Sequence, residues 1–267
     1  MTLLPKKINR NPNHIDEFFR IWNEMEYDIL TESELEDFGV VMNNYARINK
    51  QFINIYSLKQ KRVLYLSDNL GEVLGYDCSP EEYKKWSAFY WLRDLPIAQS
   101  MFFVQMSVFY KTTVQKQLEA NKISNLTFYM HNFKLSPPNK AQQHLGLTCT
   151  VLDLDKSPFL DKILIINSDV DSLIKDKEVW WCNLSINNER FYSKHSENSG
   201  FKPKHILSEK ELAVLDLIEK GLKSKEIAEK LEISTATVDK HRNNMLEWTG
   251  AKDISSLIQI AKIGKIL

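Results

Sequence analysis

The chain contains few of the residues that build phosphate-binding loops, disulfide frameworks or metal centres. It has 8 glycines and 3 cysteines in 267 residues. Without a glycine-rich phosphate loop, a GxSxG elbow or an HExxH helix, we predict no enzyme, no catalytic residue and no cofactor. The isolated thiols of Cys78, Cys149 and Cys182 lack CxxC spacing. The wide separation of the three cysteines argues against a disulfide framework and against a bound metal.

Long apolar runs and an excess charge of one sign are also missing. No stretch reaches the ~18 apolar residues that a membrane helix requires, and residues 1–13 lack the apolar core of a signal peptide. The 35 basic and 35 acidic residues balance, and residues 201–267 hold 12 basic and 10 acidic ones. We therefore expect a cytoplasmic protein with no membrane partner. Its affinity for nucleic acid would depend on local charge placement and on avidity between two copies.

The last 60 or so residues show the pattern of short, closely spaced helices. Ser208 and Glu211 form a capping-box pair before a leucine-rich helix, and Gly221 suits the left-handed position that ends it. A second helix is expected over 224–231, a third from Ser234 to about Glu247, and a fourth over about 253–262. Only Glu232 and Ile233 separate the second helix from the third, and two residues are enough only for a turn. Such a hairpin can place one helix in the DNA major groove.

This segment resembles the DNA-binding domain of the LuxR family, and the match spans about 60 of the 267 residues without a gap. The residues that carry the resemblance are Ser208, Glu211, Gly221, Lys225–Ala228, Ser234, Thr237, Val238, His241, Asn244, Met245, Gly250 and Ala251. The resemblance implies a bacterial transcriptional regulator whose partner is double-stranded DNA. It also implies that the third helix is the recognition helix.

The resemblance and the residue chemistry together predict the DNA contacts. Asp239, Lys240 and Asn243 fall where family members touch base edges, and Lys and Asn side chains suit guanine and adenine edges. Basic side chains and the backbone N–H groups at a helix N-terminus can bind the phosphates of the DNA backbone. The full predicted set is Ser224, Lys225, Thr235, Thr237, Asp239, Lys240, His241, Arg242, Asn243 and Asn244. For His241 taken alone, a capping or packing role is an equal alternative.

The fourth helix carries an apolar stripe of Leu257, Ile258 and Ala261. Family members pair through this last helix, so the resemblance implies a homodimer on DNA. We expect the stripe to form a self-complementary seam between two copies.

The first 200 residues change their periodicity several times. Helical spacing before residue 49 gives way to strands, then short helices, then further strands. The strands are expected over 53–57, 62–67, 126–135, 145–154, 163–167, 179–186 and 190–193, and the helices over 69–74, 80–86 and about 97–120. The predicted organisation is N-terminal helices over 1–49, a sensor domain over 50–195, a linker over 196–203 and the DNA-binding domain over 204–267.

Two strands, then helices, then three antiparallel strands is the order of a PAS domain. The segment from Leu66 to Asn69 followed by Leu74-Gly75-Tyr76 is similar to that family's sequence after its second strand. The predicted fold class is therefore α+β, a PAS-like antiparallel sheet with helices followed by an all-α four-helix unit. The resemblance implies signal sensing or dimerisation.

Aromatic residues are dense in this region and can line a pocket for an apolar small molecule. The predicted pocket would lie between the sheet and the helices, among Trp86, Phe102, Phe128, Tyr129 and Trp180. The alternative is that these aromatics simply form the core.

Two other functions also stay open for the whole chain. One is a response regulator, which requires repeated βα units, and the other is a PAS module that binds protein and no ligand.

Overall fold

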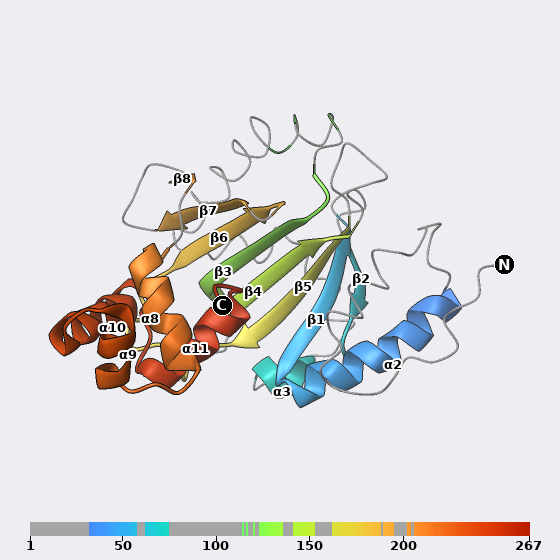
Figure 1. Cartoon of the computed structure of the whole chain (residues 1–267). Coiled ribbons are helices and arrows are strands. Elements are labelled where there is room, and N and C mark those ends of the chain that lie inside the picture. Colours follow the sequence, from blue (N-terminus) through green and yellow to red (C-terminus); the bar gives the residue numbers. More distant parts are fainter. Residues whose placement is uncertain are drawn as a thin grey trace.

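The computed structural model describes residues 32–57, 62–74, 114, 116, 120, 123–135, 141–152, 162–187, 189–194, 202–203 and 206–267. These residues form an antiparallel sheet with α2 (Glu32–Ile48) beside one end and helices α8–α11 beside its middle strands (Figure 1). Among them no helix is both long and apolar enough to cross a membrane. The antiparallel sheet differs from the repeated βα units that a response-regulator receiver requires.

The sheet has eight strands in the order β2-β1-β5-β4-β3-β6-β7-β8, and every neighbouring pair is antiparallel. The strands are β1 (Gln51–Ser57), β2 (Arg62–Leu66), β3 (Leu126–Leu135), β4 (Gln143–Val151), β5 (Lys162–Asp169), β6 (Trp181–Ile186), β7 (Glu189–Lys194) and β8 (Lys202–Pro203). The seven strands expected from the sequence are all present, with ends shifted by a few residues at most. The short β8 is an addition, and it falls within the segment expected to be a linker.

The core divides between the two faces of the sheet because side chains alternate along each strand. On β3, Met130 packs in an apolar cluster with α3 (Leu70–Leu74) and with Phe52 of β1. Its neighbour Tyr129 packs on the opposite face, in the cluster that contains the C-terminal helices. Asn132 has a φ of 57° where the β3–β4 register shifts. Two residues of β3 oppose one residue of β4 there, and this bulge lets the strand twist without losing its pairing on either side.

The C-terminal unit contains α8 (Glu209–Glu219), α9 (Ser224–Leu231), α10 (Thr235–Thr249) and α11 (Ile254–Ile263), as the sequence predicts. Ser208 and Glu211 form the expected capping box, with Ser208 N donating to a Glu211 carboxylate oxygen over 2.8 Å. Gly221 has a φ of 86°, the left-handed geometry expected of it. Ser234 and Asp253 cap α10 and α11. Local capping chemistry therefore determines where these helices begin.

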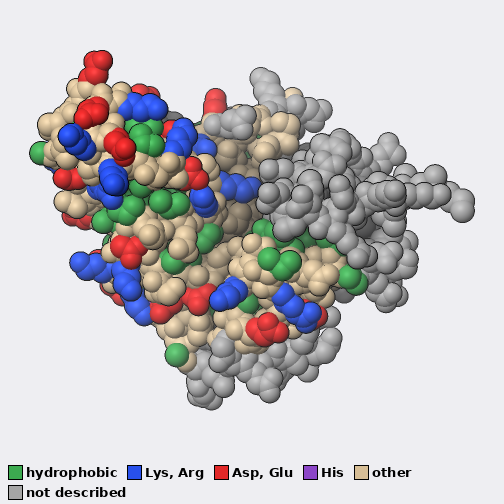
Figure 2. Space-filling model, turned by 60° about the horizontal axis from the view of Figure 1, so that its bottom comes forward, with side chains coloured by type: hydrophobic (Ala, Val, Ile, Leu, Met, Phe, Trp, Pro, Cys, Tyr) green, Lys and Arg blue, Asp and Glu red, His purple; other side chains and the backbone are tan. Residues whose placement is uncertain are grey.

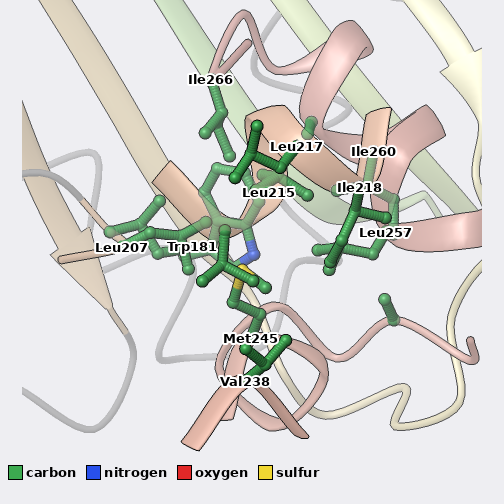
Figure 3. Packing of buried hydrophobic residues seen from close by; sticks show 14 of the residues in the cluster. Trp181, Leu207, Leu215, Leu217, Ile218, Val238, Met245, Leu257, Ile260 and Ile266 are labelled. Atoms are coloured by element: carbon green, nitrogen blue, oxygen red, sulfur yellow. The ribbon is translucent and has the colours of Figure 1, made fainter. Parts of the chain in front are cut away.

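The helical unit packs directly against the sheet and shares one apolar cluster with it. Trp181 of β6 is fully buried, and Figure 3 shows its ring among residues of α8, α10 and α11. Backbone hydrogen bonds join the two parts: Lys175 N donates to Gly250 O, and Lys252 N to Leu173 O, each over 2.9 Å. Nothing in the sequence pattern indicated this contact.

The prediction that the apolar stripe of α11 forms a seam between two copies is wrong for the chain as it folds here. Leu257 and Ala261 are completely buried inside their own chain, and Ile258 is partly buried against the same cluster. The apolar stripe of α11 packs inside its own chain, in the cluster that the helices share with the sheet. It is therefore not available to a second copy.

Candidate DNA-binding interface

Helices α9 and α10 form a tight hairpin with α10 outermost (Figure 1). The turn between them is made by Glu232, which adopts a left-handed φ of 54°, and Ile233, whose N–H donates to Ala228 O over 3.0 Å. Ile227 and Ala228 of α9 are buried against Val238 of α10 in the shared cluster. The geometry is that of a helix-turn-helix, in which the second helix is free on its outer side.

The N-terminus of α10 is capped by a side chain. Ser234 Oγ accepts a hydrogen bond from Thr237 N over 3.1 Å and lies 2.8 Å from Thr237 Oγ1. Thr235 is exposed and Thr237 half-buried in this first turn. The N–H groups at the start of a helix carry partial positive charge, which favours an anion such as a phosphate.

The outer face of α10 is polar and open to solvent. Val238 and Met245 are completely buried, and they place Asp239, Lys240 and Asn243 on the outside, where all three are exposed. The docking of the helical unit on the sheet does not cover this face. The side chains predicted to contact base edges are therefore accessible in the chain as it folds.

One hydroxyl joins the two helices of the hairpin. Ser224 Oγ, at the start of α9, donates to Asp239 Oδ1 over 2.9 Å and accepts from Arg242 Nη1 over 3.2 Å. Asp239 therefore has a partner within the hairpin. The sequence placed Ser224 and Arg242 at phosphates and Asp239 at a base edge. The structure adds that the three hold α9 and α10 in a fixed relation.

The remaining predicted contacts occupy different environments. Lys225 is exposed in the first turn of α9, while His241 and Asn244 are half-buried on α10. His241 Nδ1 is buried and makes no hydrogen bond within the described part of the chain. This burial is compatible with the packing alternative for His241.

Basic and acidic side chains are intermixed on the face shown in Figure 2, without a continuous basic patch. On α9, the two basic residues Lys225 and Lys230 are matched by the two acidic residues Glu226 and Glu229. A single helical unit of this kind offers few uncompensated cations to phosphate. Strong binding would require two units acting together.

Three of the five predicted pocket residues are described by the structure, and they do not all belong to one apolar cluster. Phe128 and Trp180 belong to the cluster on the α3 face of the sheet, whereas Tyr129 lies on the face that holds the helical unit, where burial raises its pKa. Phe128 and Tyr129 are adjacent on one strand, so they must point to opposite faces. Trp86 and Phe102 lie outside the described residues.

A small cavity of about 170 Å³ lies instead beside the C-terminal segment, between it and the sheet. Arg190 borders it and donates to Ile266 O over 3.3 Å, and Thr148 donates to Ile263 O over the same distance. The lining is mostly polar, with Asn125, Thr127, Asn183 and Ser185, and it also includes Phe128 and Tyr129 of the predicted pocket. Its character differs from the aromatic pocket that the sequence indicated.

The geometry and the sequence agree on the class of this unit, which is a helix-turn-helix domain. Residues 205–261 match the family model described as "Bacterial regulatory proteins, luxR family". The C-terminal domain is thus a luxR-family domain, as the resemblance predicted.

Curated relatives match over the same part of the chain. The oxygen regulatory protein NreC of Staphylococcus carnosus is 41% identical over 70 residues, which is 26% of this chain and 32% of NreC. NreC of Staphylococcus aureus is 43% identical over 65 residues, or 24% of this chain and 30% of NreC. The chain spans about a third of the length of these relatives.

Two LuxR-type receptors of known structure align over most of the chain. Vibrio cholerae VqmA, solved as a dimer in the absence of target DNA, is 16% identical with a TM-score of 0.28 and 88% coverage of both chains. Escherichia coli SdiA is 14% identical with a TM-score of 0.25, covering 94% of this chain and 96% of SdiA. At TM-scores below 0.5, neither the fold nor the function of the first 200 residues is assigned from them.

Proposed function

We propose that the protein is a bacterial, cytoplasmic transcriptional regulator that binds double-stranded DNA as a homodimer through α10. The observation that carries this proposal is the exposed outer face of α10, on a luxR-family hairpin whose helices are capped and joined through Ser224. Lys240 and Asn243 contact base edges in the major groove, and Arg242, Lys225 and the first turn of α10 contact phosphates. The similarity of the C-terminal domain to NreC, an oxygen regulatory protein, supports the general class.

The sheet is the PAS-like sensor or dimerisation module of this regulator. Two features support that proposal: the order in which β1 and β2 are followed by α3 and then by the antiparallel strands β3, β4 and β5, and the apolar cluster on the α3 face. Phe128 and Trp180 belong to this cluster, so an apolar small molecule would bind on that side. The aromatics are otherwise core residues, and the module then serves only to bind protein.

A salt titration tests DNA binding without knowledge of the operator. The full chain is titrated into a fluorescent pool of duplexes with randomised centres at several salt concentrations. We expect the logarithm of the binding constant to fall linearly with the logarithm of salt, because phosphate contacts release counterions. An affinity that is absent, or independent of salt, would overturn the proposal in favour of a protein-binding module.

A further inference from the structure

The sheet is polar on the face beneath the C-terminal segment, where the cavity of about 170 Å³ lies. The strand register explains this polarity. Thr127 of β3 is opposite Ser185 of β6, and Ser185 is opposite Arg190 of β7. Side chains directly opposite one another in antiparallel strands share a face, with Cβ atoms about 5 Å apart. These three therefore form a polar row across three strands, and all of them line the cavity.

The neighbouring row contains a buried amide that has no partner within the described part of the chain. Asn183 of β6 is opposite Tyr129 of β3, is only 8% exposed and lines the same cavity. Its side chain makes no hydrogen bond to any residue that the structure describes. A buried polar group without a partner costs free energy, so a molecule in the cavity has to supply the missing bonds. Asn183 and Arg190 are diagonal neighbours on adjacent strands, with Cβ atoms about 7 Å apart, so one small molecule can contact both.

The charge of the lining is positive. Arg190 donates from Nη1 to Ile266 O over 3.3 Å, and this is the one hydrogen bond that its side chain makes within the described residues. A guanidinium has further N–H donors, and it binds a carboxylate through two parallel hydrogen bonds. Lys265 also borders the cavity, and none of the described residues that line it is an Asp or a Glu. A lining of this composition favours an anion over a cation.

The end of α11 is the one feature that opposes an anion here. The segment that follows this helix lies over β3 and β4 (Figure 1), and a helix C-terminus carries a partial negative charge. That charge is about half of an elementary charge, whereas the guanidinium of Arg190 carries a full positive one. The carbonyl of Ile263 is in addition bonded to Thr148 Oγ1. The positive charge therefore dominates at the Arg190 side of the cavity.

We infer that this cavity binds a small hydroxycarboxylate, with the carboxylate on Arg190 and a hydroxyl group on Asn183. A cavity of about 150 Å³ holds one benzene molecule, so a volume of about 170 Å³ suits an acid of a few carbon atoms. The amide of Asn183 and the hydroxyl groups of Thr127 and Ser185 both donate and accept hydrogen bonds. They match the hydroxyl groups of such a ligand, and Arg190 matches its charge.

The site is shared between the sheet and the helical unit, because Gly264 and Lys265 line it together with the strand residues. A ligand that contacts both parts binds only while they are packed together, and it therefore stabilises their packing. This face of the sheet is opposite to the α3 face, on which the apolar ligand of the proposed function would bind. The inference goes beyond that function, and neither of its tests requires DNA.

The first test is calorimetric titration of the full chain with L-lactate, D-glycerate and the neutral glycerol. We expect saturable binding of both acids with one site per chain, and no binding of glycerol. Arg190→Gln should weaken the binding of either acid by about tenfold or more, because hydrogen bonds to charged groups are strong. Asn183→Leu should weaken it as well without lowering the thermal midpoint, since the amide has no partner to lose among the described residues.

Arg47→Gln is the matched control, because it removes the same charge from an arginine that is paired with Asp68 outside the cavity. It should bind both acids as the wild type does. If neither acid binds, the cavity holds only water and the inference is overturned. Glycerol that binds as tightly as glycerate, or an unchanged affinity in Arg190→Gln, would overturn it too.

The second test locates the bound acid by hydrogen exchange at the amides of Lys175 and Lys252, whose hydrogen bonds join the sheet to the helical unit. With D-glycerate at about 100 times its dissociation constant, opening of this contact should slow by about a hundredfold. The same concentration should have a much smaller effect on Arg190→Gln. Binding without slower exchange would place the acid elsewhere and overturn the inference. Binding of the acid by a chain without salt-dependent DNA affinity would overturn only the proposed function.

Discussion

The indole N–H of Trp181, in β6, donates to the backbone carbonyl of Thr249, the last residue of α10, over 3.4 Å. This bond joins the sheet to α10 within an apolar cluster that both parts share. A shared core means that the two parts should unfold together rather than in sequence.

Replacement of Trp181 tests that coupling. Trp181→Ala should lower the free energy of unfolding by about 3–5 kcal/mol, since the ring is completely buried. In urea, the variant should lose the single transition and unfold in two steps, because the contact between the parts is weakened. Trp248→Ala should change the free energy by less than about 1 kcal/mol, since that ring is partly exposed. A single, unshifted transition in Trp181→Ala would contradict the coupling.

A second prediction uses the close approach of Gly264 to the sheet. A Cβ at this position would lie 2.9 Å from Cδ1 and Cε1 of Tyr129, so Gly264→Ala should push the helical unit away. Hydrogen exchange should then accelerate at the amides of Lys175 and Lys252, whose bonds cross the contact. The double variant with Tyr129→Leu removes the opposing ring atoms and should exchange more slowly than Gly264→Ala. Gln259→Ala, on the exposed side of α11, serves as the control and should leave both amides protected.

The Ser224 hydroxyl gives a third prediction. Ser224→Ala removes both the donor to Asp239 and the acceptor for Arg242. Without these bonds, α9 and α10 are held less firmly in the arrangement that binds DNA. We expect the binding free energy to weaken by about 1 kcal/mol, which is a several-fold loss of DNA affinity, with little change in the thermal midpoint. Ser255→Ala, an exposed serine on α11, should leave DNA affinity unchanged. Equal affinities for the two variants would show that the bridge has no role in binding.

Base and phosphate contacts should separate in a fourth experiment. Lys240→Ala and Asn243→Ala should each cost about 1–3 kcal/mol on the preferred sequence and relax the selection of bases from a randomised pool. Arg242→Ala should weaken binding to every sequence alike and make the salt slope shallower. If all three variants select the same sequences as the wild type, α10 is not the helix that contacts the bases.

Local signals in the sequence predicted the secondary structure well, because each is set by neighbouring residues. The capping pair Ser208 and Glu211, the left-handed Gly221 and the strand over residues 126–135 all appear as expected. The accessible face of α10 follows from the same periodicity, since Val238 and Met245 define the inner side.

The packing between parts could not be predicted, because it depends on residues far apart in the chain. Leu257 has the same pattern whether its stripe is buried against its own chain or against a second copy. Tyr129 and Phe128 looked like members of one aromatic pocket, but strand alternation sends them to different faces. The packing of Trp181 against the C-terminal helices cannot be predicted from the strand period of β6 or from the helical period of α8–α11.

The last prediction concerns His131, which is completely buried beneath the helical unit. Its ring stacks on Trp181 at 5.0 Å, and Nδ1 lies 3.1 Å from Tyr129 Oη. Within the described residues Nε2 makes no hydrogen bond. Burial lowers the pKa of His131 from 6.5 to about 3. The unfolded chain therefore binds a proton at a pH where the folded chain does not, and stability is lost as the pH falls from 6.5 towards 3.

A His131→Phe variant should remove this dependence, since it keeps a flat ring on Trp181 but cannot take a proton. The difference in unfolding free energy between wild type and variant should be constant above pH 7. Below that, it should shift against the wild type by up to about 1.4 kcal/mol per pH unit. His144, whose pKa burial also lowers despite the opposing charge of Asp171, is present in both proteins and cancels in the difference. Urea midpoints measured from pH 7.5 to pH 4 provide the comparison. Parallel profiles would mean that His131 is already protonated, or solvated, in the folded chain.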